Sequence, residues 1–287
     1  MLTREQIAFY HKNGYLGVEN VLSSEVVDEL RRVTDEFIER SRQVTENDDV
    51  FDLEPDHSPQ QPRLRRLKDP VQQHLVYDRA LRHDAILQIV TQLIGPSFHT
   101  NGDKLNMKSP GFGSPVEWHQ DWAFYPHTND DLLAVGVCMD AMRVENGCLQ
   151  VIPGSHRGPV LDHHLDGHFA GAVTAPDFDD SGAVPIELEA GDISIHHTRT
   201  LHASLPNVSA QPRRLLLFQY CAADAWPLIH VEWETHCRRF VRGEPSNLPR
   251  VMDVPVRLPY PPAKRQGSIY ESQSVLRHST FKKSHET

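Results

Sequence analysis

The stretch Val116-Glu117-Trp118-His119-Gln120-Asp121 decides how the rest of the chain is interpreted. An extended chain directs side chains two positions apart to the same side, so His119 and Asp121 can offer an imidazole and a carboxylate to one metal ion. A 2-His-1-carboxylate iron site needs one further histidine and open coordination positions. His202, near the end of the segment Gly191 to Ser204, is the candidate for that third ligand.

Other histidines compete with these positions. His164-Leu165-Asp166 repeats the H-x-D spacing, but it lies in a polar run, whereas the first motif follows an apolar strand entry and is framed by two tryptophans. We therefore interpret the second motif as part of a solvated loop. His196 and His197 compete with His202, which is preferred because a turn and an apolar strand follow it.

The strand after His202 begins at Arg213, eleven residues further on. In an antiparallel hairpin a residue about ten positions on returns beside the first, which places a guanidinium near the metal. Arginine holds carboxylates through two parallel hydrogen bonds. The spacing thus predicts a small dicarboxylate bound to the metal at one end and to Arg213 at the other. Ser204, two residues after His202, can add a hydroxyl donor.

The composition excludes several classes of function. The chain has 287 residues, 29 Lys and Arg against 39 Asp and Glu, and a formal charge of -10, so no nucleic-acid surface is expected. No signal peptide and no run of roughly 18 apolar residues is present, so we predict no membrane segment and a soluble, cytoplasmic protein. Four cysteines without a C-x-x-C pair are expected to be free thiols in a reducing compartment.

The order of the predicted elements indicates an α+β fold that is mainly β. Helices are expected first, and short strands broken by Gly, Pro and Asn follow from residue 98, which favours a two-sheet β core with the helices packed outside. The expected helices are 4–12, 25–42 and 83–94. The expected strands are 104–108, 115–119, 132–140, 148–152, 185–188, 192–196 and 213–222.

Three further segments are interpreted from their composition. Residues 45–70 are expected to form a long loop, whose Arg63, Arg65 or Arg66 meets an anionic group in a substrate pocket or lies in solvent. Residues 162–182 are expected to be an irregular insertion. Trp122 to Asp131 follows the metal motif, so its aromatic and imidazole side chains are expected either to line the substrate pocket or to pack: Trp122, Phe124, Tyr125 and His127.

Together, W-H-Q-D, the distal H-x-S and the arginine eleven residues later resemble the phytanoyl-CoA dioxygenase (PhyH) family of iron(II)- and 2-oxoglutarate-dependent oxygenases. The segments Glu145 to Gly158 and Leu2 to Tyr15 carry the same resemblance, which covers about residues 1 to 225. It implies one domain over 1–257, with a helical part to about 97, a cupin-like double-stranded β-helix (jelly-roll) over about 98–225, and a loosely held tail over 258–287.

The resemblance also implies the chemistry. His119, Asp121 and His202 are expected to hold Fe(II), with 2-oxoglutarate and O2 as cosubstrates and with Arg213 and Ser204 at the far carboxylate. Lys104 is expected either to contact the cosubstrate or to face solvent. The family often has a tryptophan near Gly136, and its absence predicts extra room beside the cosubstrate.

The carboxylate of Asp121 favours hydroxylation, because halogenating relatives replace it with a small residue. The expected reaction oxidises a small organic metabolite or lipid-like substrate and releases succinate and CO2. Two alternatives are a cupin-type metal enzyme without oxygenase chemistry and a non-catalytic ligand-binding jelly-roll. The first needs no dicarboxylate clamp, so Arg213 argues against it. The complete set of His119, Asp121 and His202 argues against the second.

Overall fold

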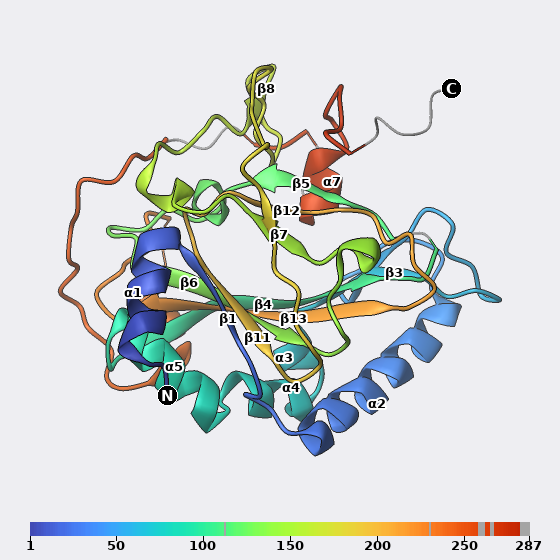
Figure 1. The fold of residues 1–287 in the computed structure, drawn as a ribbon, viewed down its shortest axis with the longest axis horizontal. Helices are drawn as coiled ribbons and strands as arrows, with labels where there is room; N and C mark the ends of the chain where they lie inside the picture. The colour runs from blue at the N-terminus through green and yellow to red at the C-terminus, as the bar shows by residue number, and fades with distance from the viewer. Residues whose placement is uncertain (112, 230, 258–261, 265–266, 282–287) are drawn as a thin grey trace.

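The computed structural model describes residues 1–111, 113–229, 231–257, 262–264 and 267–281. Figure 1 shows three layers, in which helices cover one face of a large sheet and a smaller sheet lies over the other face. The helices are α1 (Arg4–Asn13), α2 (Ser24–Arg40), α3 (Pro70–Gln73), α4 (Leu75–Leu81), α5 (Asp84–Ile94), α6 (Trp233–Arg238) and α7 (Ile269–Gln273).

The large sheet has the strand order β1-β11-β6-β13-β4-β3-β2, and β14 also pairs with β4. Every pairing between its strands is antiparallel. Its strands are β1 (Tyr15–Val18), β2 (Phe51–Leu53), β3 (Leu64–Lys68), β4 (Phe98–Lys108), β6 (Leu132–Cys138), β11 (Ile193–His197), β13 (Arg213–Ala222) and β14 (Phe240–Arg242).

The small sheet has the order β10-β7-β12-β5 and carries part of the predicted metal site. Its strands are β5 (Val116–His119), β7 (Leu149–Val151), β10 (Val184–Pro185) and β12 (His202–Ser204). Within the expected insertion, only the two-residue strands β8 (His164–Leu165) and β9 (His168–Phe169) pair. The two facing antiparallel sheets form the predicted jelly-roll core, and the predicted α+β, mainly β class is confirmed.

Local sequence explains where the first helix begins and ends. The Thr3 hydroxyl accepts a hydrogen bond from the Gln6 backbone N–H, and the Gln6 side chain returns to the Thr3 backbone, which makes a capping box. Gly14 ends the helix at φ 79°, where a Cβ would lie 2.4 Å from Nδ1 of His156. Only glycine fits this position, because the left-handed conformation and the close contact both exclude a side chain.

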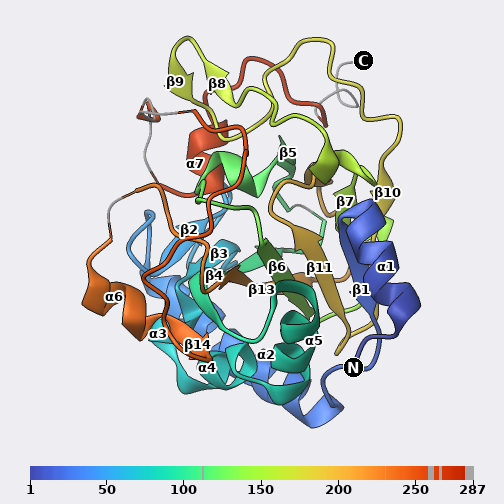
Figure 2. The ribbon, with the colours of Figure 1, turned by 90° about the vertical axis from the view of Figure 1, so that its left-hand side faces the viewer.

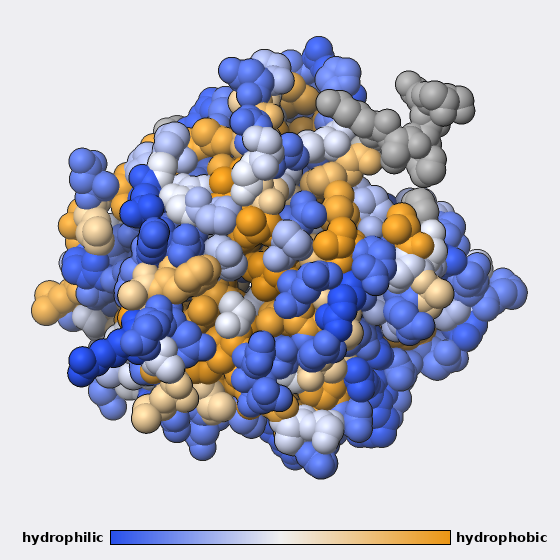
Figure 3. Space-filling model, in the orientation of Figure 1, coloured by the Kyte–Doolittle hydropathy of each residue, from blue (hydrophilic) through white to orange (hydrophobic). Residues whose placement is uncertain are grey.

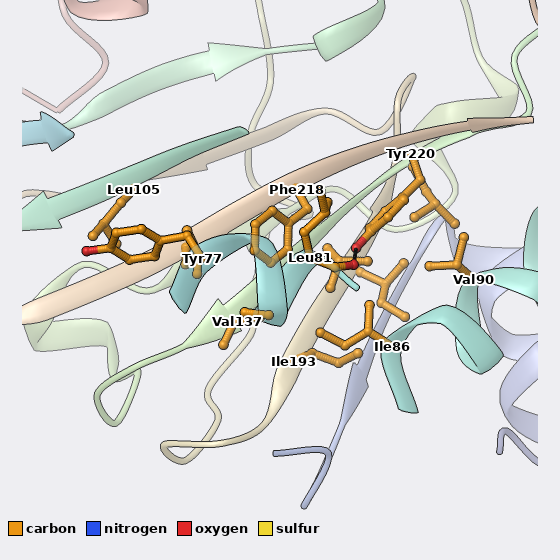
Figure 4. Close-up of a cluster of buried hydrophobic side chains, with 14 of the residues drawn as sticks. Tyr77, Leu81, Ile86, Val90, Leu105, Val137, Ile193, Phe218 and Tyr220 are labelled. Carbon is orange, nitrogen blue, oxygen red and sulfur yellow. Dashed lines mark hydrogen bonds between the residues drawn. The ribbon is translucent and has the colours of Figure 1, made fainter. Parts of the chain in front are cut away.

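The main hydrophobic core lies between the helices and the large sheet. Figure 4 shows Tyr77 and Leu81 of α4 and Ile86 and Val90 of α5 packed against side chains of the strands. The Tyr220 hydroxyl donates a hydrogen bond of 2.7 Å to the Leu81 carbonyl, so this buried polar group is satisfied. Each large apolar side chain buried here contributes roughly 1.5–3 kcal/mol, which anchors the large sheet as the rigid floor of the site.

The predicted loop over residues 45–70 is wrong in part. Phe51–Leu53 and Leu64–Lys68 form β2 and β3, which extend the large sheet beyond β4. Buried Phe51, Leu64 and Leu67 hold this hairpin to the core. The segment therefore presents Arg65 and Arg66 from a strand of the sheet, and Arg63 lies just before it.

The described part of the expected tail is not loosely held. Figure 2 shows α7 beside β5, and the Glu117 backbone N–H donates a hydrogen bond of 3.1 Å to Oε1 of Gln273. Ile269 and Tyr270 of α7 are buried against Val116. Residues 258–261, 265–266 and 282–287 of the predicted tail lie outside the described residues.

The extra room predicted near Gly136 is not found. A Cβ at Gly136 would lie 2.6 Å from Oγ of Ser194 and 3.0 Å from Cδ1 of Leu215. The side chains of β11 and β13 thus occupy the space that a larger residue in β6 would need.

Figure 3 shows hydrophilic residues over most of one face, with hydrophobic residues gathered near its centre. None of the helices in the described ranges is long and apolar enough to span a membrane.

Asp103, in β4, gives a prediction for the pH dependence of stability. Burial raises its pKa to about 6, although the Val71 backbone N–H donates a hydrogen bond to its carboxylate. Since this pKa lies above the ordinary aspartate value of 3.8, the folded state binds the proton more tightly, and the stability from this group is lost as pH rises through 6. We expect Asp103→Asn to increase the free energy of unfolding at pH 8 and to change it little at pH 4, measured by urea denaturation. An equal effect at both pH values would contradict this origin.

Candidate metal centre and adjoining cavities

His119, Asp121 and His202 converge at one point between the two sheets. β12 pairs with β5 so that His202 lies opposite His119, and Asp121 begins the short helical turn that follows β5. Oδ1 of Asp121 lies 3.8 Å from Nε2 of His119 and 3.9 Å from Nε2 of His202. All three side chains are buried, and each offers a ligand atom within 4.8 Å of the other two. The antiparallel pairing of β5 with β12 thus brings together residues far apart in sequence.

The two imidazoles are held in the tautomer that a metal requires. Nδ1 of His119 donates to the Glu117 carbonyl at 2.8 Å, and Nδ1 of His202 donates to the Thr200 carbonyl at 2.9 Å. Burial lowers the pKa of His119 to about 3 and that of His202 well below its ordinary value. Both rings are therefore neutral at physiological pH, with the Nε2 lone pairs directed toward Asp121.

The carboxylate of Asp121 is ionised despite its burial. Burial alone would raise its pKa, but the Lys104 ammonium and a hydrogen bond from His196 hold the pKa well below the ordinary value. Nε2 of His196 lies 3.4 Å from Oδ2, so Oδ1 is left to face the two histidines. Burial, and then the neighbouring carboxylate, raises the pKa of Tyr125 well above 10, so its phenol keeps its proton. Two neutral imidazoles and one carboxylate fit a mononuclear iron(II) centre.

Gln120, between the two ligands of the motif, fixes the backbone of the site. Its N–H donates to Nε2 of His163 at 2.9 Å, and its amide nitrogen donates to the Pro159 and Arg199 carbonyls. Its amide oxygen accepts from the Leu161 N–H. The fully buried amide therefore joins the end of β5 to two other segments.

A cavity runs from the three ligands to Arg213. It is lined by Ser204, His196, Asn106 and Lys104 in addition to the ligands and apolar residues. Nε and Nη2 of Arg213 donate to the Gly147 carbonyl at 3.1 and 3.0 Å. Nη1 is buried and has no partner among the described residues. A buried, unsatisfied guanidinium nitrogen indicates a site for an anionic ligand.

Gly147 is a supporting residue that the sequence analysis did not place at the site. Gly147 adopts φ 76°, and a Cβ there would lie 2.3 Å from the Leu205 carbonyl oxygen. The turn thus directs the Gly147 carbonyl to the guanidinium of Arg213. The available signal in the sequence was the Asn146-Gly147 pair, which lies shortly before β7.

A second, more open cavity of about 520 Å³ meets the first at Asp121, Lys104 and Ile269. Phe124, Tyr125 and Arg66 line it, as the sequence suggested for a substrate pocket. Ile269 belongs to α7 and was not predicted for the site, since nothing in the C-terminal sequence indicates where the helix docks.

Three other predicted pocket residues lie elsewhere. Trp122 is buried, donates to the Pro255 carbonyl at 2.8 Å and lines a separate surface cavity. His127 is buried and donates to the Tyr125 carbonyl, so it packs behind the site. Arg63 lies 3.3 Å from the Asp56 carboxylate and does not line the cavity beside Asp121.

The competing histidines do not join the metal centre as ligands. His164 pairs with Asp162 at 2.8 Å, and Asp166 pairs with Arg277 at 2.8 Å near the surface. His197 accepts a hydrogen bond from the Arg199 N–H, and its ring lies 5.2 Å from the ring of His156 at an interplanar angle of 55°. His196 contacts Asp121 but lies outside the group of three that can share an ion.

A family model described as phytanoyl-CoA dioxygenase matches residues 10–215. The chain belongs to the phytanoyl-CoA dioxygenase family. A probable alpha-ketoglutarate-dependent hypophosphite dioxygenase of Stutzerimonas stutzeri is 35% identical over 283 residues, which cover 95% of this chain and 97% of that protein. The family predicted from the motifs is thus confirmed.

Solved structures related to this phytanoyl-CoA dioxygenase family member include EvdO2 from Micromonospora carbonacea var. aurantiaca, complexed with 2-oxoglutarate. Its TM-score is 0.62 at 25% identity, and the match covers 81% of this chain and 96% of that one. EctD from S. alaskensis with bound Fe has a TM-score of 0.66 at 21% identity over 86% of both chains, which is a likeness of fold. These findings favour the oxygenase over the two alternative functions.

Proposed function

We propose that this protein is an iron(II)- and 2-oxoglutarate-dependent dioxygenase in which His119, Asp121 and His202 hold the iron and Arg213 binds the far carboxylate of 2-oxoglutarate. The observation that carries the proposal is the position of Arg213 Nη1, which is buried and has no partner among the described residues, at the far end of the cavity that begins at the three ligands. A cupin-type enzyme without a dicarboxylate cosubstrate would bury this cation without a counter-ion, at a cost of several kcal/mol.

Iron with 2-oxoglutarate supplies activation of O2, which yields succinate, CO2 and one oxygen atom for oxidation of the substrate. The chain's residues position the reactants. Arg213 and the Ser204 hydroxyl orient the dicarboxylate, and His196 holds Asp121 through Oδ2. Phe124 and Phe169 form an edge-to-face wall with ring centroids 4.9 Å apart, which excludes water from one side of the substrate cavity.

The substrate is proposed to be a small molecule. The relative from Stutzerimonas stutzeri is named for hypophosphite, and we take that ion as the first candidate. Its oxidation would insert one oxygen atom of O2 into a P–H bond to give phosphite, while the other atom enters succinate. We also propose a reducing, cytoplasmic location, since all four cysteines are free and three of them are buried.

The proposed function predicts a visible metal-to-ligand absorption band. When Fe(II) and 2-oxoglutarate are added without oxygen, we expect a band from the chelate, because the open positions of the centre accept both the keto and the carboxylate oxygen. Addition of oxygen should release succinate and bleach the band. Metallated protein that gives neither the band nor succinate would contradict the proposal.

A further inference from the structure

The cavity beside Asp121 contains more positive than negative charge. Arg66 of β3 and Lys104 of β4 line it together with one carboxylate, Asp121. Its other walls are mainly apolar or aromatic, among them Phe124, Phe169 and Ile269. Two cations in an otherwise apolar pocket indicate a ligand that carries negative charge.

The register of the large sheet places both cations on one face. Arg66 lies opposite Asn106, and Lys68 lies opposite Lys104. Side chains two apart in a strand share a face, so Arg66 and Lys104 are diagonal neighbours on the face that points toward the metal centre. This juxtaposition is set by backbone pairing and is therefore rigid.

Arg66 is oriented but not fully satisfied. Its Nε donates to Oδ1 of Asn106 at 3.1 Å, and its guanidinium lies 5.6 Å from the ring centre of Tyr270 in α7. Asp52 is 4.0 Å away and pairs more closely with Lys68, at 2.9 Å. The side chain of Arg66 is only 11% exposed, and its Nη2 has no partner among the described residues. One donor thus remains for a ligand.

Lys104 has no hydrogen bond or ion pair to another side chain in the part of the chain that the structure describes. Burial lowers its pKa, the Asp121 carboxylate opposes this effect, and Arg66 adds to it. The ammonium lies where the two cavities meet, so it can face a ligand in either. Lys104 is half-buried at the cavity and has no close counter-ion there among the described residues, so a bound anion would stabilise its charge.

We propose that Arg66 and Lys104 bind an anionic oxygen group of the substrate, so that the substrate is a small oxyanion or a small molecule with such a group. The inference rests on the proposed function, since it assigns the substrate to the second cavity while 2-oxoglutarate occupies the cavity that ends at Arg213. The aromatic wall of Phe124 and Phe169 limits the size of the remaining part of the ligand.

The test uses the full chain with Fe(II) and 2-oxoglutarate under anaerobic conditions, in which no turnover occurs. Hypophosphite and methylphosphonate are titrated while the absorption band is followed, and the binding heat is measured in parallel. Dimethyl methylphosphonate serves as the uncharged match. We expect both anions to bind and shift the band, and the neutral diester to do neither. Arg66→Met should lower the affinity for both anions at least about tenfold, as expected for loss of a hydrogen bond to a charged group.

Lys68→Met is the matched control, because Lys68 lies on the same strand and face but does not line the cavity. This variant should bind both anions within about twofold of the wild-type affinity. Lys104→Met should lower the affinity for the anions more than it lowers the affinity for 2-oxoglutarate. If neither anion binds, if the diester binds equally well, or if Arg66→Met binds the anions like wild type, the inference is overturned. Absence of the band in wild type would instead contradict the proposed function.

Discussion

Asp121→Asn is expected to abolish tight iron binding and to reduce succinate formation from 2-oxoglutarate at least about 100-fold. Changes to residues that only orient a metal ligand already lower metal affinity or activity 10- to 100-fold. Asp121 supplies the only carboxylate of the three-residue group, so its loss should have at least as large an effect. Its Oδ1 lies within 3.9 Å of both imidazole nitrogens, where an amide keeps the shape but loses the charge. Iron content after anaerobic reconstitution and the intensity of the absorption band are the measurements.

The chain provides a matched control in the second H-x-D motif. Asp166→Asn makes the same chemical change in a residue that is paired with Arg277 at the surface, and asparagine tolerates its φ of 53°. We expect this variant to bind iron and form succinate like wild type. Normal iron content and turnover in Asp121→Asn, or a comparable loss in Asp166→Asn, would show that the first motif does not hold the metal.

The sequence predicts those parts of the site that depend on local geometry. The two-residue spacing of His119 and Asp121 in an extended segment is enough to place both side chains on one side. His202 and Arg213 do line one cavity, but the hairpin expected between them is wrong. β12 pairs with β5 and β7 in the small sheet, whereas β13 pairs with β4 and β6 in the large sheet, so the two residues reach the cavity from facing sheets. Strand periodicity and turn residues gave β5, β6, β11 and β13 within about two residues.

Parts that depend on long-range packing could not be predicted in this way. Arg66 reaches the cavity beside Asp121 because β3 pairs with β4. In this pairing Arg66 lies opposite Asn106, which is 40 residues later in the chain. Ile269 reaches it because α7 docks on β5, fixed by the contact between Gln273 and Glu117. No periodicity in a polar segment or in a short terminal helix specifies such partners. The walls of the cavity beside Asp121 were therefore less predictable than the group of His119, Asp121 and His202.

Arg213→Met is expected to raise the concentration of 2-oxoglutarate needed for half-saturation on the order of 100-fold while iron affinity is kept. Arg213 is 2% exposed, and two of its donors are fixed by Gly147. The remaining nitrogen faces the cavity, so a bound carboxylate would form a desolvated, charge-assisted pair. Loss of one partner of such a pair typically costs 2–5 kcal/mol, and about 2.7 kcal/mol corresponds to 100-fold. Titration of the absorption band with 2-oxoglutarate measures the effect without turnover.

Arg214→Met separates loss of binding from loss of stability. Arg214 lies on the other face of β13, where Asp140 accepts two hydrogen bonds from its guanidinium at 2.8 and 2.9 Å. Its removal should lower the free energy of unfolding by about 2 kcal/mol, because the buried Asp140 carboxylate loses two charge-assisted hydrogen bonds and keeps Arg31 at 3.6 Å. The 2-oxoglutarate affinity should stay within about twofold of wild type, since Arg214 does not line the cosubstrate cavity. Equal weakening of 2-oxoglutarate by both variants would mean that a distorted β13, and not the Arg213 guanidinium, explains the loss.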